Sequence, residues 1–185
     1  MKGAPGFQKW PDPVLREWKR DFIIWLAGET GIRNLVETGT HMGGMALELS
    51  PYFDRIDTIE LSPVFYQRSR EMLQSFPNIY QHQGSSRVIL KEVLSRLIVD
   101  PLMFWLDAHF SGGLTAHDGD PLPEELKVIT QYRPESLILV DDMSGTAFED
   151  SPVWPKDLDL SGWIRDYRTG IVLMHRGQFN IPEFE

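Results

Sequence analysis

Several carboxylates stand directly after short apolar runs, where a strand would end and its last side chains would be free to do chemistry. Asp107 follows the run 102–106 (LMFWL), and Asp141 and Asp142 follow the run 137–140 (LILV). An ionised carboxylate has two acceptor oxygens, so it can bind a cation, a hydroxyl or a backbone N–H. Plainer explanations also apply: Asp107 can cap a helix, and an Asp-Asp pair can form an Asx-type turn.

A glycine turn follows an earlier apolar run. The segment 35–44, LVETGTHMGG, is followed by MALEL, which favours a helix. Gly39 and Gly43 would let a ligand approach the backbone, and the N–H groups that begin the helix would face a negative group. A dinucleotide fingerprint of the form G-x-G-x-x-G would need glycine where this chain has His41. Taken alone, the pattern fits an ordinary strand-to-helix turn equally well.

Two further strand ends carry polar residues. Glu60 lies 21 residues after Gly39, and a carboxylate at this place can accept both hydroxyls of a ribose or cap the helix that begins at Pro63. The segment 83–86, QGSS, follows the next apolar run. Its small polar residues can bond the edge of an adenine, or Ser86 can be a helix N-cap.

The elements that carry these residues alternate between strands and helices. Predicted strands end at positions 37, 60, 82, 107 and 141, which are 23, 22, 25 and 34 residues apart. A parallel crossover needs a dozen or more residues, so this spacing predicts an α/β fold with a mostly parallel sheet between helices. A first helix is predicted from the helical spacing of the apolar residues Trp18, Phe22, Trp25 and Leu26. Gly28 and Gly31 would end this helix. Near the C-terminus we expect a helix over 158–166 and a hairpin of 171–175 with 179–181.

Composition excludes several classes of protein. The chain has 185 residues, a formal net charge of -9 and no cysteine. The charge disfavours a general nucleic-acid binder, and the lack of cysteine excludes zinc–thiolate sites, iron–sulfur clusters, disulfides and thiol nucleophiles. No apolar run approaches the roughly 18 residues of a membrane helix, and MKGAPGFQKWPDP lacks the apolar stretch of a signal peptide. We therefore expect a cytoplasmic protein with no nucleic-acid or membrane partner.

The motifs VETGTHMGG, IELSP, QGSS, FWLDAHFSGG and ILVDDM, in that order, resemble the class I S-adenosylmethionine-dependent methyltransferases over residues 33–143. Within that superfamily the chain is similar to small-molecule O-methyltransferases that use a divalent metal, the macrocin and catechol types. The resemblance implies a Rossmann-like three-layer sandwich whose seven-stranded sheet has six parallel strands and one antiparallel strand. Residues 1–185 would form one domain, with an N-terminal arm and helix (1–31), a cofactor-binding core (32–143) and a C-terminal edge (144–185).

The resemblance also implies the cofactor and metal sites. Contacts with S-adenosylmethionine are expected at Glu37, Gly39, Gly43, Glu60 and Ser85, and we add Thr40, His41 and Asp107 as neighbouring candidates. In the family's strand order the strands that end before Asp107 and Asp141 are neighbours, roughly 5 Å apart. Asp107, Asp141 and Asp142 would then converge, and such carboxylates repel one another unless a cation or a proton intervenes. Oxygen ligands favour a hard cation, which would be magnesium or calcium, with manganese as another option.

The expected activity is methyl transfer from S-adenosylmethionine to an oxygen of a small molecule, namely a diol, a sugar or a phenol. His109 would take the proton from the acceptor, with Asp107 as the alternate, although a histidine that donates to a nearby carbonyl explains His109 about as well. The glycine-rich segment 111–120 would be a lid or a long connection. A nicotinamide oxidoreductase and a non-catalytic nucleoside-binding relative stay open as alternatives, and a homodimer is compatible with the sequence.

Overall fold

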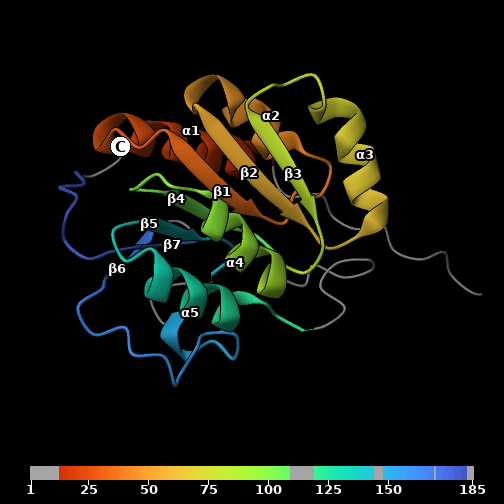
Figure 1. Cartoon of the computed structure of the whole chain (residues 1–185). Coiled ribbons are helices and arrows are strands. Elements are labelled where there is room, and N and C mark those ends of the chain that lie inside the picture. Colours follow the sequence, from red (N-terminus) through yellow and green to blue (C-terminus); the bar gives the residue numbers. More distant parts are fainter. Residues whose placement is uncertain (1–12, 109–118, 144–147, 169, 183–185) are drawn as a thin grey trace, which may run out of the picture.

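One seven-stranded sheet organises the chain, with the strand order β3-β2-β1-β4-β5-β7-β6 (Figure 1). The computed structural model describes residues 13–108, 119–143, 148–168 and 170–182. The strands are β1 (Asn34–Thr38), β2 (Arg55–Glu60), β3 (Ile79–Gln83), β4 (Met103–Leu106), β5 (Leu137–Val140), β6 (Ile164–Arg168) and β7 (Ile171–His175). Strands β1 to β5 each end within one residue of the five predicted strand ends.

The strand directions agree with the predicted fold class. β1 to β5 pair in parallel, and β7 runs antiparallel to both of its neighbours, β5 and β6. β6 therefore runs in the same direction as β1 to β5, so six strands are parallel and one is antiparallel. The sheet ends in the expected antiparallel edge hairpin.

The partner of β7 in that hairpin differs from the prediction. β7 pairs with the preceding segment β6, and the predicted helix over 158–166 and strand over 179–181 are both wrong. β6 ends at Arg168 and β7 begins at Ile171, and Gly170, directly before β7, has a φ of +90°. β6 lies at the sheet edge and is largely polar, IRDYR, so it lacks the apolar run of a central strand.

Helices cover both faces of the sheet (Figure 1). On one face lie α1 (Pro13–Thr30), α2 (Gly44–Leu49) and α3 (Pro63–Leu73), and on the other lie α4 (Ser86–Arg96) and α5 (Leu122–Tyr132). Alternate strand residues divide between the two cores: Met103 and Trp105 pack with α1, whereas Phe104 and Leu106 pack with α4 and α5. This is the predicted three-layer arrangement. Two short 3-10 helices, η1 (Ser50–Tyr52) and η2 (Phe148–Asp150), complete the described elements.

The first helix ends at the second of the two glycines that are predicted to end it. α1 includes Gly28 and stops at Thr30, where Gly31 takes a φ of +73° and donates its N–H to the Ala27 carbonyl. In the part of the chain that the structure describes, no helix combines the length and the apolarity of a membrane span.

The sheet has one topological switch point, between β1 and β4. The chain builds outward from β1 through β2 to β3 and then crosses to the other side of β1 to form β4 and β5. The connections on the two sides leave the carboxyl edge in opposite directions, and open α/β sheets bind their ligands in the crevice that results. Position 39 follows β1 here and position 107 follows β4, so both predicted groups of site residues lie at this edge.

A buried aspartate links β2 and β3 at the β3 edge of the sheet. Asp57 of β2 is 1% exposed and accepts hydrogen bonds from Arg55 Nε at 2.7 Å and from His82 Nε2 of β3 at 2.8 Å. Burial alone would raise the pKa of Asp57, but His82 and Arg55 outweigh it, and the net result is a lowered pKa. The ionised carboxylate therefore stabilises the native fold.

We predict that Asp57→Asn lowers the free energy of unfolding by about 1–2 kcal/mol near neutral pH. The loss is no larger because both partners, Arg55 and His82, are themselves partly exposed. The pKa of Asp57 lies below its ordinary value of 3.8, so its contribution is complete above that pH and is lost as the pH falls further. The difference between variant and wild type should therefore shrink in acid. Denaturant titrations at several pH values measure it.

Asp166→Asn is the matched control. Asp166 pairs with Arg168 two residues along β6, but its side chain is 43% exposed, and we expect a change within about 0.5 kcal/mol. Equal losses for the two variants would contradict the stabilising role of the buried pair.

Candidate active site

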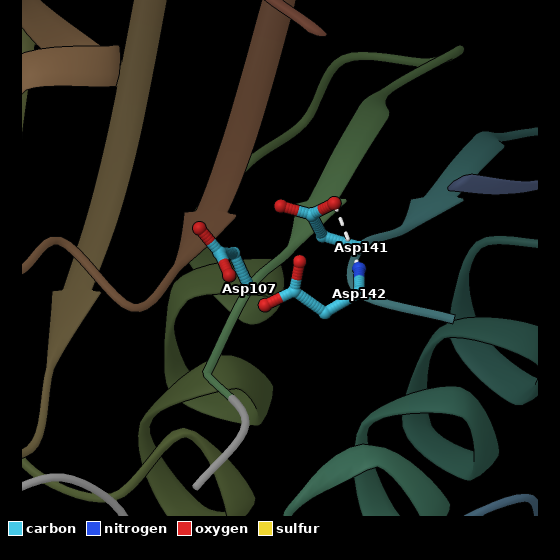
Figure 2. A group of neighbouring side chains, drawn as sticks. All are labelled: Asp107, Asp141 and Asp142. Carbon is cyan, nitrogen blue, oxygen red and sulfur yellow. Dashed lines mark hydrogen bonds between the residues drawn. The ribbon is translucent and has the colours of Figure 1, made fainter. Parts of the chain in front are cut away.

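Three aspartates meet at the ends of β4 and β5. Asp107 directly follows β4 and Asp141 directly follows β5, and the residues before them, Leu106 and Val140, are partners in the sheet register. Asp107, Asp141 and Asp142 each offer a carboxylate oxygen, and these oxygens lie within 4.8 Å of one another (Figure 2). The predicted convergence is thus present. That these residues bind a metal stays a prediction.

Backbone hydrogen bonds set the positions of the three carboxylates. Asp107 N–H donates to the Thr38 carbonyl of β1, and Asp141 N–H donates to the Leu106 carbonyl of β4. Asp142 has a φ of +53°, and its N–H donates to Asp141 Oδ1 at 2.8 Å (Figure 2). Aspartate tolerates the left-handed conformation better than most residues. The turn that follows β5 therefore points both carboxylates of the Asp-Asp pair toward Asp107.

A lysine from the first helix enters this acidic cluster. Lys19 Nζ lies 2.6 Å from Asp141 Oδ1 and 3.0 Å from Asp142 Oδ1, and the Lys19 side chain is only 8% exposed. α1 precedes β1 and runs back along the sheet, so its N-terminal half lies toward the carboxyl edge while the packing of Phe22 and Leu26 holds it on the core. The cluster therefore combines three acids with one buried ammonium.

The charges of the cluster are only partly balanced. Burial raises the pKa of Asp141 to about 6, against the opposing effect of Lys19. Burial, followed by repulsion from Asp141 and Asp142, raises the pKa of Asp107 well above its ordinary value. The two acids also raise the pKa of Lys19, because their attraction outweighs the cost of burying the ammonium. The site therefore still favours additional positive charge.

Gly39 brings the end of β1 against the end of β4. It has a φ of +89°, and a Cβ at this position would lie 2.3 Å from the backbone oxygen of Asp107. Gly43 has a φ of +82° and makes a similar approach to α3, because a Cβ there would lie 2.9 Å from Leu73 Cδ1. Gly39 is thus required by a backbone contact within the protein, whatever ligand it also serves. Gly43 is favoured by its positive φ, since the end of the Leu73 side chain could move.

A chain of hydrogen bonds lies behind the glycine turn. Thr58 Oγ1 donates to Glu37 Oε2, and Thr40 Oγ1 lies within hydrogen-bond distance of Thr58 Oγ1. Glu37 is 1% exposed, and burial raises its pKa to about 8, with Glu60 adding to the shift and Thr58 opposing it. The hydroxyl of Thr40, a residue that we predict to contact the cofactor, points toward Thr58.

Glu60 holds the two turns that follow β1 and β2. Its Oε2 accepts from His41 N–H at 2.7 Å and its Oε1 accepts from Ser62 N–H at 2.8 Å. His41 itself has a φ of +50°, and its ring packs on Phe65 with 4.4 Å between the centroids. Each carboxylate oxygen keeps a second lone pair, so these bonds leave Glu60 able to accept from ribose hydroxyls.

The other predicted site residues are placed as follows. Ser85 is the N-cap of α4, with its carbonyl accepting from Val88 N–H and Ile89 N–H, so the alternative N-cap at Ser86 is wrong by one residue. His109 and most of the expected lid, 111–118, lie outside the described residues.

Lys19 is the site residue that the sequence analysis missed, although the sequence carries a signal for it. Lys19 precedes Phe22 by three residues, Ile23 by four and Leu26 by seven, which places it on the apolar stripe of the helix. A lysine is almost never fully buried without a partner. Its place on that stripe indicates an acid elsewhere in the chain, but it does not indicate which acid.

Solved structures share this architecture. Neither the family models nor the curated proteins yield a match to the sequence. Podospora anserina methyltransferase PaMTH1 bound to S-adenosylhomocysteine (SAH) is 16% identical with a TM-score of 0.63, over 90% of this chain and 82% of that chain. The O-methyltransferase TomG from Streptomyces achromogenes, in complex with S-adenosylmethionine (SAM), is 18% identical with a TM-score of 0.56, over 89% of this chain and 88% of that chain. The chain has the methyltransferase fold.

The close approach of Gly39 to the backbone of Asp107 has a testable consequence. We predict that Gly39→Ala lowers the free energy of unfolding by about 2 kcal/mol or more, because the added methyl strains a positive φ and displaces the backbone at Asp107. Gly28→Ala is the control, since nothing lies within 4 Å of a Cβ at that position in α1, and it should stabilise the protein by roughly 0.5–1 kcal/mol. Thermal unfolding compares the two, and an equal effect of both substitutions would contradict the close approach.

The buried Glu37 predicts a particular dependence of stability on pH. Its pKa is about 8 in the native fold against an ordinary value of 4.5, so the native state keeps the proton while the unfolded chain loses it. Between these two pH values the wild type loses stability with rising pH, and Glu37→Gln removes that loss. The variant should gain on the order of 4 kcal/mol relative to wild type from the lower to the higher pH. Parallel pH profiles in denaturant titrations would contradict a buried neutral Glu37.

Proposed function

We propose that this protein transfers a methyl group from SAM to an oxygen of a small molecule, with the assistance of a divalent cation. The observation that carries the proposal is the meeting of two sets of residues at one switch point. Gly39 and Glu60 follow β1 and β2, and the aspartate cluster follows β4 and β5. The methyltransferase fold and the bound SAH and SAM of the two similar structures support this function.

The cofactor would lie on the β1–β2 side of the crevice. Glu60 is 6% exposed and is held by two backbone N–H groups, so its carboxylate is already oriented to accept from the two ribose hydroxyls. Ser85 at the start of α4 and His41 in the glycine turn would line the same pocket, with Glu37 and Thr40 behind it. SAM would supply an electrophilic methyl group on a sulfonium.

The acceptor and a cation would lie on the β4–β5 side. The donor set fits a hard divalent cation, because Asp107, Asp141 and Asp142 present oxygen atoms within 4.8 Å of one another, with more negative charge than Lys19 neutralises. When bound, the cation would lower the pKa of an acceptor hydroxyl and orient it. Two vicinal oxygens suit such a site, so a diol or a catechol is the favoured acceptor.

Asp107 joins the two sides of the crevice. It contacts the glycine turn through its backbone and the acidic cluster through its carboxylate, so it would fix the distance between the methyl donor and the acceptor. Asp107 and His109 are our candidates for the group that takes the acceptor's proton. The acceptor oxygen would attack the methyl carbon in line with the C–S bond that breaks as SAH leaves. This step depends strongly on alignment, and the rigid contact at Gly39 would supply part of it.

A direct assay tests this function. We expect the protein to release SAH from SAM in the presence of a catechol, a sugar diol or a phenol and Mg²⁺, and the rate to fall at least about a hundredfold with chelator or in Asp141→Asn. Glu60→Gln should instead weaken SAM binding by about tenfold, measured by calorimetry, because it loses a charged acceptor for the ribose.

The outcomes separate the two parts of the proposal. Product formation that survives both chelator and Asp141→Asn would refute the role of the cation. Binding of NAD in place of SAM would refute the methyltransferase activity itself.

A further inference from the structure

We propose that Lys19 is a built-in counter-cation of the acidic cluster, and that a divalent cation binds there only by displacing the Lys19 ammonium from Asp141 and Asp142. This inference rests on the cation site of the proposed function and adds a residue from α1 to it. Lys19 would keep the three acids assembled while no cation is bound, and it would set how tightly a cation binds.

The distances show why the two cations compete. Lys19 Nζ bonds Asp141 Oδ1 at 2.6 Å and Asp142 Oδ1 at 3.0 Å, so the ammonium lies between the two carboxylates. Asp141 Oδ1 also accepts the N–H of Asp142, which leaves that oxygen little room for a third partner. A divalent cation would bind oxygens of the same carboxylates at about 2.0–2.6 Å, where it would lie next to the like charge of the ammonium.

The surroundings of Lys19 allow the side chain to leave without unfolding the helix. Phe22, Ile23 and Leu26 anchor α1 in the core, and each is at most 1% exposed. The lysine stem is four carbons long and flexible, and Asp142 at the mouth of the cluster has a side chain that is 58% exposed. The ammonium can therefore move toward solvent while the backbone of α1 stays in place.

The competition has a quantitative consequence. A cation that binds only the fraction of molecules whose Lys19 has left the cluster has its apparent affinity reduced by that fraction. Removing the ammonium removes this reduction, so a neutral residue at position 19 should bind the cation more tightly. A purely structural lysine would give the opposite result, because its loss would loosen the three ligands.

The experiment measures Mn²⁺ binding to the full chain by calorimetry and by electron paramagnetic resonance, for wild type and Lys19→Met. We expect the variant to bind Mn²⁺ at least about tenfold more tightly. Arg16→Met is the matched control: it removes a positive charge from the same helix, but Arg16 pairs with Glu48 rather than with the cluster. Its Mn²⁺ affinity should stay within about twofold of wild type. An unchanged or weakened affinity in Lys19→Met, or equal gains in the two variants, would overturn the proposal.

A second measurement does not depend on the variant being folded. In wild type with ¹⁵N-labelled lysine, the buried Lys19 ammonium should give a slowly exchanging NMR signal that is lost when Mg²⁺ is added. Persistence of that signal at saturating Mg²⁺ would also overturn the proposal. SAH binding, measured on the same samples, reports the cofactor part of the proposed function separately. Normal SAH binding with no gain in Mn²⁺ affinity would refute the role of Lys19 alone.

Discussion

Electrostatic repulsion at the carboxyl edge of the sheet is the constraint on which the rest of this structure depends. The register of β4 and β5 brings Asp107 and Asp141 to neighbouring strand ends, and the turn after β5 adds Asp142 to them. Such a group is costly to assemble away from water unless positive charge accompanies it. Lys19 supplies one charge from α1, which links the placement of that helix to the integrity of the site.

The contact at Gly39 joins this charged region to the rest of the crevice. The backbones that follow β1 and β4 approach so closely that no side chain fits between them, and the switch point of the sheet lies between these two strands. The pocket proposed for the cofactor and the acidic cluster therefore share a wall. Displacement of Asp107 would alter both at once, which makes the glycine a structural requirement of the site as a whole.

Buried acids are concentrated along this one edge. Glu37 and Glu60 lie behind and beside the glycine turn, each at most 6% exposed, and Asp141 is 3% exposed. Raised pKa values at Glu37, Asp107 and Asp141 mark a place where the fold accepts a loss of stability. Proteins tolerate such local cost where a ligand later compensates it, and strongly perturbed groups in a crevice are typical of functional sites.

The sequence by itself determined the five parallel strands β1 to β5, the helices between them and the acids at the strand ends, because apolar runs and their spacing are local properties of the chain. It did not determine the partner of β7, since the polar edge strand β6 has no apolar pattern and is a strand only through pairing. Only the tertiary structure placed Lys19 beside Asp141, 122 positions away in sequence. A buried charge indicates that a partner exists, but the identity of that partner is a long-range property of the packed fold.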